Sequence, residues 1–225
     1  MAIGIKIAID GPAAAGKSTI AKMTAEKLGY TYIDTGAMYR ALTHKALSQS
    51  IDTTNGEELK SLLQETEIVL LPSKEGQAVI VDGMDVSEEI RSQQVTAHVS
   101  AVAIHTGVRE LMVEKQRQLA EGMGVVMDGR DIGTAVLPNA ELKIFMTASV
   151  EERAMRRHIE NSRRGMISSL DNLKVEISER DRVDSEREVS PLRQAEDAVL
   201  IDTTSMSIED VANQISELAE KRLAL

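Results

Sequence analysis

Short apolar runs of strand type alternate along this chain with stretches in which apolar residues recur at helical spacing. The first run ends at Asp10 and a helical stretch follows it, predicted at 17–28 and ended by Gly29. Further strand-type runs lie at 30–34, 124–128, 142–146 and 198–202, and a last helix is predicted after Ser207. Strands that alternate with helices are typical of a parallel sheet covered by helices. The pattern therefore predicts an α/β fold.

The region between Asp52 and Arg91 departs from this alternation. Two β-type runs, at 67–71 and 78–83, are joined by a short turn, with a further short strand predicted at 84–86. Such a pair of runs predicts a β-hairpin. Because an antiparallel hairpin does not fit between the units of a parallel sheet, we expect an inserted β-rich subdomain at about 51–90.

A glycine-bounded loop follows the first strand directly, and its sequence is Gly11-Pro12-Ala13-Ala14-Ala15-Gly16-Lys17-Ser18-Thr19. It contains G-x-x-x-x-G-K-S, in which the glycines let successive N–H groups point at an anion. The N-terminus of the following helix adds its positive dipole end. Lys17 is placed to reach the β- and γ-phosphates, and the Ser18 hydroxyl is placed to hold Mg²⁺. The alternative is an ordinary strand-to-helix turn, but strand and helix on either side favour a nucleoside triphosphate site.

A second group of polar residues follows the strand predicted at 124–128. Asp128 ends that strand, and Gly129-Arg130-Asp131-Ile132-Gly133-Thr134 comes next. In a phosphate-loop protein an aspartate at this position can hold Mg²⁺, directly or through water. Arg130 and Asp131 then project over the same edge of the sheet as the phosphate loop. A β-turn whose aspartate binds its own backbone is the alternative.

Arginine is concentrated near the carboxyl-terminal third. Nine of the fifteen arginines lie between Arg153 and Arg193. Arg153 and Arg157 share one helix face, and Arg180, Asp184 and Arg187 are spaced to share a face of a second helix. Two such helices joined by a turn predict a lid over phosphates at about 151–189. The alternative for these two helices is a salt-bridged, exposed helical hairpin. For Arg40 taken alone, the alternative is an ordinary surface position.

Composition excludes several classes of protein. A chain of 225 residues suits one α/β domain. A net charge of −10, one Phe and no Trp argue against nucleic-acid binding. No cysteine is present, so disulfides and cysteine zinc sites are excluded. No run reaches the length of a membrane span and no signal peptide is recognised. We expect a cytoplasmic protein without a membrane partner, and a monomer, since no further apolar stripe calls for a second copy.

Four motifs in their order and spacing make the chain similar to one family. They are the phosphate loop, Asp34-Thr35-Gly36-Ala37-Met38-Tyr39-Arg40, the segment 128–134, and Arg180-Asp181-Arg182-Val183-Asp184-Ser185-Glu186-Arg187. Together they resemble the bacterial cytidylate kinase family over nearly the whole chain. The resemblance implies a P-loop NTPase three-layer sandwich with a central parallel sheet of about five strands. It places the core at 1–50, 91–150 and 190–225, with the insert as a subdomain that binds the nucleoside monophosphate, and a helical arginine-rich lid.

The same resemblance implies transfer of the γ-phosphoryl group of ATP, with Mg²⁺, to CMP or dCMP, giving CDP or dCDP. The resemblance implies that the acceptor phosphate is held by Arg40, Arg130 and Arg187, and that the cytosine edge is read by Ser100, Arg109 and Asp131. It implies that Arg180 and Asp184 contact the ribose and that Thr35 positions the acceptor. It also implies that Arg153 and Arg157 close over the ATP phosphates. Catalysis then rests on Lys17, Arg130, Arg187, Arg153 and Arg157, without a base, because the acceptor oxygen is already anionic. One departure is Ala14, where many relatives have glycine, and it matters only if the residue needs a positive φ.

Three other functions remain as alternatives. The first is a kinase for another acceptor, such as an adenylate or uridylate kinase. The second is a GTPase-like switch, although the chain contains no N-K-x-D or T-K-x-D sequence for guanine. The third is an adaptor that binds nucleotide without turnover.

Overall fold

A sheet of five parallel strands lies at the centre of the computed structural model, which describes residues 4–73, 76–122, 124–163 and 165–224. Its strands are β1 (Lys6–Asp10), β2 (Thr31–Asp34), β6 (Val125–Gly129), β7 (Leu142–Thr147) and β8 (Val199–Asp202). They run in the order β2-β6-β1-β7-β8. The predicted parallel sheet is confirmed, and the carboxyl ends of all five strands share one edge.

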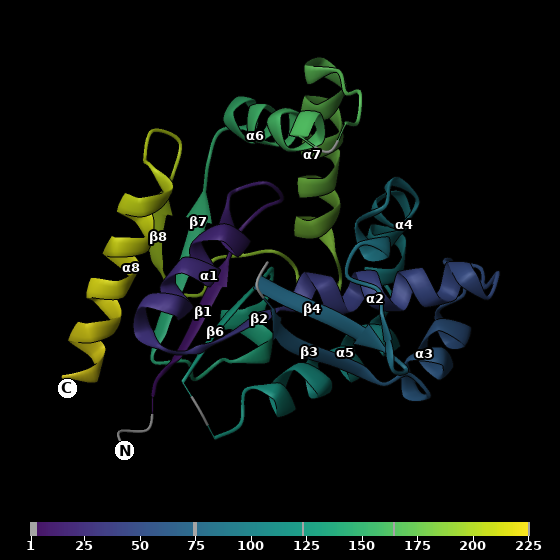
Figure 1. Cartoon of the computed structure of the whole chain (residues 1–225), viewed down its shortest axis with the longest axis horizontal. Helices are drawn as coiled ribbons and strands as arrows, with labels where there is room; N and C mark the ends of the chain where they lie inside the picture. The colour runs from purple at the N-terminus through teal and green to yellow at the C-terminus, as the bar shows by residue number, and fades with distance from the viewer. Residues whose placement is uncertain (1–3, 74–75, 123, 164, 225) are drawn as a thin grey trace.

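Helices cover both faces of this sheet. Alternate residues of β1 point to opposite sides: Ile7 and Ile9 pack with α1 (Lys17–Leu28) and α8 (Ile208–Leu223), which lie together in Figure 1. Ala8 belongs to the other face, where α5 (Thr106–Leu119) and a single π-helical turn (Ile132–Val136) complete the core. The predicted three-layer arrangement is therefore confirmed.

The segment after β2 carries the predicted hairpin. Helix α2 (Thr35–Ser48) leads to α3 (Gly56–Gln64) and then to β3 (Ile68–Ser73), β4 (Gly76–Val81) and β5 (Met84–Asp85). These three strands form a separate antiparallel sheet, which confirms the hairpin and its short third strand. Helix α3 packs on α5, in a cluster that also includes α2 and α4 (Gln93–Ala103) and against which β3 packs. The boundaries of the insert stay a prediction.

Two helices stand over the carboxyl edge of the large sheet. They are α6 (Val150–Arg163) and α7 (Leu170–Glu186), which pack on each other and lie at the top of Figure 1. The hydroxyl of Ser149 accepts the backbone N–H of Glu152 at 3.2 Å and so caps the N-terminus of α6. The Glu152 carboxylate bonds Arg156 at 3.0 Å.

The end of α7 differs from the prediction. The sequence pattern extended the second helix to about 190, but α7 ends at Glu186, and Arg187 has an extended backbone with φ −56 and ψ 139. Arg187 therefore does not share a helix face with Arg180 and Asp184. The chain turns there, and the Leu192 N–H donates back to the Asp184 carbonyl at 2.7 Å.

Candidate active site

The loop between β1 and α1 has the geometry of an anion cradle. Gly16 has φ 91 and precedes the first turn of α1, whose N-terminus has no side-chain cap. Gly11 has φ 150, and a Cβ there would lie 2.1 Å from the Met146 carbonyl oxygen of β7. Only glycine fits so close to a neighbouring backbone. The uncapped N–H groups of the helix thus remain available for phosphate oxygens.

Ala14 at the tip of this loop has φ 59, in the left-handed region that favours glycine. The departure from the glycine of many relatives therefore has a physical consequence, because an alanine in this conformation costs about 1 kcal/mol. Its methyl group packs against the apolar cluster of α6 and α7 that contains Ala154, Leu173 and Ile177. The strained residue thus joins the loop to these two helices.

Lys17, the first residue of α1, is buried, with 5% of its surface exposed. Its Nζ donates to the Pro12 carbonyl at 2.8 Å, inside the loop. Burial, followed by the positive charge of Arg130, lowers the pKa of Lys17 below its ordinary value. A phosphate bound in the loop adds negative charge to that of Asp128 and Asp10, which favours the charged form of Lys17.

The carboxylate of Asp128, at the end of β6, is surrounded by hydroxyl groups. Ser18 Oγ donates to Oδ2 at 2.9 Å and Tyr32 Oη donates to Oδ1 at 2.8 Å. The Thr35 hydroxyl donates to the Asp128 carbonyl at 2.7 Å. Burial first, and next the charge of Asp34, raise the pKa of Asp128. A cation is the natural partner for such a carboxylate.

Ser18 and Asp128 thus lie together, as predicted for a metal site. In the described part of the chain no three His, Cys, Asp or Glu residues gather as a ready-made metal cluster. This donor set fits Mg²⁺, which uses one or two protein oxygens and completes its shell with water and phosphate.

A cavity opens beside the loop, between α2, α4, α5, α7 and the end of β6. All nine residues predicted to bind the acceptor line it: Thr35, Arg40, Ser100, Arg109, Arg130, Asp131, Arg180, Asp184 and Arg187. Sequence reasoning missed five further lining residues, which are Gly36, Tyr39, Val99, Ala103 and Gly129. Tyr39 and Gly36 belong to the recognised motif 34–40, so that motif was the available signal.

Positive charge dominates this cavity although the chain as a whole carries −10. Five arginines and two aspartates line it. Burial, followed by the charge of a neighbouring arginine, lowers the pKa values of both Arg40 and Arg180. Like charges held this close indicate a site for an anion.

The floor of the cavity is a buried ion pair. Arg109 is 1% exposed, and its Nη2 lies 2.5 Å from Asp131 Oδ2. The same guanidinium lies 5.6 Å from the centroid of the Tyr39 ring. Arg109 Nε and Tyr39 Oη are buried and have no hydrogen-bond partner among the residues that the structure describes. Unpaired donors beside a paired carboxylate leave hydrogen-bonding capacity for a polar ligand.

The wall carries a second ion pair. Arg130 Nε donates to Asp184 Oδ2 at 2.9 Å, and Arg187 Nη1 lies 3.6 Å from Asp184 Oδ1. Within the described part of the chain, Arg187 Nη2 is buried and has no hydrogen-bond partner. Asp184 therefore holds two arginines side by side.

Asp10, which sequence reasoning did not single out, holds the segment that follows Arg130 and Asp131. It is 4% exposed, and its carboxylate accepts the backbone N–H groups of Ile132 and Gly133 at 2.8 and 2.7 Å. Burial raises the pKa of Asp10 to about 6 against the lowering effect of these two bonds. Its place before the phosphate loop was visible, but its partners lie more than a hundred residues away.

Comparison with known proteins identifies the family of this chain. The model of the family described as cytidylate kinase matches residues 7–221. The chain is 63% identical over 219 residues to the cytidylate kinase of Geobacillus kaustophilus (strain HTA426), with 97% of this chain and 98% of the relative covered. It is 59% identical over 218 residues to the cytidylate kinase of Bacillus subtilis (strain 168), with 97% of each covered. The chain belongs to the cytidylate kinase family.

Membership of the cytidylate kinase family confirms the resemblance inferred from the four motifs and makes the chain a phosphotransferase. A solved structure, described as an uncharacterized protein from Eubacterium ventriosum, superposes with a TM-score of 0.52 at 11% identity, covering 96% of this chain and 98% of the other. That likeness concerns the fold alone. Among helices in the described ranges, none combines the length and apolar character of a membrane span.

In this member of the cytidylate kinase family, the two arginines predicted to close over the ATP phosphates have surroundings that differ from each other. Arg153 is 4% exposed and bonds the Ala148 and Ala13 carbonyls at 2.9 and 3.3 Å, and its Nη2 lies 2.7 Å from Asp181. Arg157 pairs with Glu160 at 3.4 Å, and its charge helps to lower the pKa of Arg40, so it lies near the cavity. The joint role of Arg153 and Arg157 stays a prediction.

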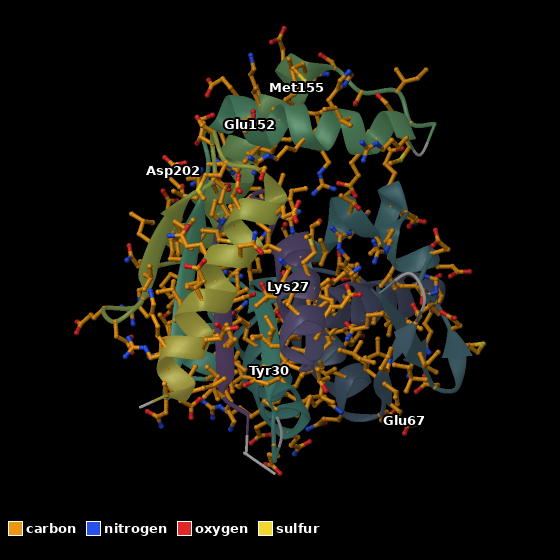
Figure 2. All side chains as sticks on the ribbon, turned by 60° about the vertical axis from the view of Figure 1, so that its left-hand side comes forward. Lys27, Tyr30, Glu67, Glu152, Met155 and Asp202 are labelled. Atoms are coloured by element: carbon orange, nitrogen blue, oxygen red, sulfur yellow. The ribbon has the colours of Figure 1, made fainter. Side chains whose placement is uncertain are left out.

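Arg156 is the arginine of α6 that sequence reasoning missed. It donates to the Ala15 carbonyl at 3.2 Å and to the Thr203 carbonyl at 2.8 Å. Glu152 and Asp202, labelled in Figure 2, mark the two segments that Arg156 joins, α6 and the end of β8. No local sequence pattern distinguished Arg156 from the other arginines of α6, because all of them lie on one charged helix.

Proposed function

We propose that this chain transfers the γ-phosphoryl group of ATP to CMP or dCMP, giving ADP and CDP or dCDP. The observation that carries the proposal is the cavity beside the phosphate loop, because it gathers all nine predicted acceptor residues. Arg130 connects the two sites, since it lines the cavity and its charge also acts on Lys17. Donor and acceptor therefore meet at one edge of the sheet.

The Arg109–Asp131 pair suits the hydrogen-bonding edge of cytosine. A carboxylate accepts from the cytosine amino group, and a guanidinium donates to the ring nitrogen and the carbonyl oxygen. Uracil has a carbonyl where cytosine has the amino group, so it turns an acceptor towards the Asp131 carboxylate. This pair therefore favours CMP over UMP, with Ser100 as a further lining residue.

Positioning and charge neutralisation account for the rate in this proposal. Arg40, Arg130 and Arg187 hold the acceptor phosphate in line with the phosphate loop, and Lys17 neutralises charge on the donor. Mg²⁺ held at Ser18 and Asp128 adds positive charge at the transferring phosphate when it is bound. The proposed lid, α6 and α7 with Arg153 and Arg157, excludes water as it closes, so the phosphoryl group reaches the acceptor rather than water.

The decisive experiment is an acceptor panel with ATP and Mg²⁺. We expect turnover with CMP and dCMP well ahead of UMP and AMP, measured as ADP release in a coupled assay. Faster turnover of AMP or UMP indicates a kinase for another acceptor. Nucleotide hydrolysis without a phosphorylated acceptor indicates a GTPase-like switch, and binding without turnover indicates an adaptor.

Replacing Arg130 tests the acceptor site directly. Arg130→Ala removes one of the positive charges proposed to hold the acceptor phosphate, so we expect CMP turnover to fall by about 10³-fold, in line with the loss of one transition-state donor. Arg182→Ala is the matched control, because Arg182 is an exposed arginine of α7 that pairs only with Glu179 and Glu186 among the described residues. An Arg130→Ala enzyme as fast as Arg182→Ala would contradict the assignment.

The remaining expectations stay predictions. They are a cytoplasmic, monomeric enzyme without nucleic-acid or membrane partners, with CMP or dCMP as its small-molecule substrate. Size-exclusion chromatography at two protein concentrations tests the monomer, since a self-associating chain elutes earlier at the higher one.

A further inference from the structure

Tyr32 of β2 contacts the carboxylate of the proposed cation site, and neither the family motifs nor the proposed reaction uses it. Its Oη donates to Asp128 Oδ1 at 2.8 Å, while Ser18 Oγ donates to Oδ2 at 2.9 Å. Each oxygen of the buried carboxylate therefore has one hydroxyl partner. These two partners are not equivalent, because only Ser18 belongs to the phosphate loop.

The phenol of Tyr32 is held from several sides. Strand β2 pairs in parallel with β6, and Asp34 lies opposite Asp128 in that register. The Tyr32 carbonyl accepts from Gln77 Nε2 at 2.6 Å, which ties the residue to the antiparallel sheet. Its ring packs on the apolar cluster beneath the phosphate loop, and Lys22 Nζ lies 5.7 Å from the ring centroid. The hydroxyl is therefore a fixed donor.

A fixed donor on one carboxylate oxygen determines where the other oxygen points. With Oδ1 bound to Tyr32, Oδ2 faces Ser18, the second oxygen ligand proposed for the cation. Phenylalanine at this position leaves Oδ1 buried without its Tyr32 donor, so the carboxylate is held only through Oδ2 by Ser18 and its orientation is less restricted. Groups that orient a metal ligand in this way strongly affect metal affinity.

We propose that Tyr32 is a positioning residue that orients Asp128 towards the divalent cation. The proposal rests on the proposed cation site at Ser18 and Asp128, and it deepens that site by one residue. In this role Tyr32 acts through Asp128 and not by direct contact with the cation or the substrates.

Cation binding without turnover tests this role. Mn²⁺ is titrated into the enzyme with ADP present, and free Mn²⁺ is followed by electron paramagnetic resonance. For Tyr32→Phe we expect affinity about tenfold weaker, the low end of the range for such outer groups. Tyr30→Phe is the matched control, because the Tyr30 hydroxyl accepts from the Ile5 N–H at 3.2 Å, away from the site. That variant is expected to bind Mn²⁺ like the wild type.

A double-mutant cycle separates the two proposals. Asp128→Asn is expected to weaken Mn²⁺ binding, and adding Tyr32→Phe to it is expected to cause no further loss. If Asp128→Asn weakens binding and Tyr32→Phe does not, the role of Tyr32 is wrong and the cation site stands. A Tyr32→Phe loss that persists in the Asp128→Asn background also overturns it. Unchanged binding by both single variants overturns the cation site itself.

A spectroscopic experiment tests the proposal even if Tyr32→Phe fails to fold. The chain has three tyrosines and no tryptophan, so its near-ultraviolet spectrum reports mainly on Tyr30, Tyr32 and Tyr39. Adding Mg²⁺ to the ADP complex of Tyr30→Phe is expected to shift this spectrum, because the partner of the Tyr32 hydroxyl gains a cation. The shift is expected to vanish when Asp128→Asn is added. A spectrum without a shift, or a shift that survives Asp128→Asn, overturns the proposal.

Discussion

At the scale of single residues, the phosphate loop contains a strained alanine. Ala14 adopts φ 59, where a side chain is unfavourable, and its methyl group packs on α6 and α7. The Cβ atom of Ala14 therefore has two opposing effects on the free energy of unfolding. Glycine relieves the backbone strain, and it removes the apolar contact between the loop and the proposed lid.

Replacement of Ala14 by glycine measures the balance. We expect Ala14→Gly to raise the free energy of unfolding by about 0.5 kcal/mol, since relief of about 1 kcal/mol exceeds the loss of a half-buried methyl group. Urea denaturation measures the change. Ala13→Gly is the control, because Ala13 is buried and has no positive φ, so it is expected to destabilise. Equal destabilisation by both changes would show that Ala14 is not strained.

Asp10 gives the stability a pH dependence of known sign. Its pKa is raised from 3.8 to about 6 in the folded chain, so the folded state binds the proton more tightly than the unfolded state. Stability is therefore gained as pH falls through 6 towards 3.8. Relative to Asp10→Asn, which does not titrate, the wild type is expected to gain about 1 kcal/mol between pH 7 and pH 5. Urea denaturation of both proteins at the two pH values checks this, and a constant difference would contradict it.

At the scale of elements, helix α6 holds the outer side of the phosphate loop. Arg153 binds the Ala13 carbonyl and Arg156 binds the Ala15 carbonyl, so two arginines three residues apart fix carbonyls two residues apart. With these carbonyls turned towards α6, N–H groups of the loop are left for an anion. Arg153, which the family resemblance assigned to the ATP phosphates, thus also supports the backbone of the loop, as Arg156 does.

Arg156→Ala tests this support. We expect it to raise KM for ATP about tenfold with a much smaller change in kcat, because the loop loses one anchor of about 1–2 kcal/mol while no group on the substrates is removed. Steady-state kinetics with varied ATP measures both constants. Arg163→Ala, at the exposed end of α6, is the control. A fall in kcat with unchanged KM would instead place Arg156 in the chemical step.

At the scale of the whole molecule, the acceptor cavity lies where separate parts of the chain meet. Helices α2, α4 and α5 form one wall, and α7 with the end of β6 forms the other. The five arginines of this cavity outnumber its two aspartates, so a bound anion reduces the repulsion that remains among them. The phosphate of the acceptor therefore stabilises the folded molecule as well as being positioned by it.

Ligand-dependent unfolding measures this effect. At a hundred times its Kd, CMP is expected to stabilise the fold by about 2.7 kcal/mol, which raises Tm by roughly 5–10 °C for a chain of this size. Cytidine at the same concentration is the control, and it is expected to have a much smaller effect because it lacks the phosphate. Differential scanning calorimetry compares the two. Equal shifts would show that the arginines do not bind the phosphate.

Local sequence determined those features whose cause lies within a few residues. The bounds of α1, the cap of α8 at Ser207 and the five strands follow from periodicity and capping. The phosphate loop and the four family motifs are contiguous, so the family and the acceptor residues were readable in order. The end of α7 was not, because Arg187 leaves the helix through contacts made after the chain turns.

Tertiary structure alone decided which groups face one another. Asp128 is 110 residues from Ser18 and 96 from Tyr32, and Arg153 is 140 from Ala13. A hydrogen bond between such residues depends on strand order and helix packing, which periodicity does not encode. By itself the sequence therefore determined the α/β class, the phosphate loop and the family. Only the fold decided that Tyr32 holds Asp128, that Asp10 holds the segment after Asp131, and that Arg153 and Arg156 hold the loop, because these bonds form only after distant segments pack.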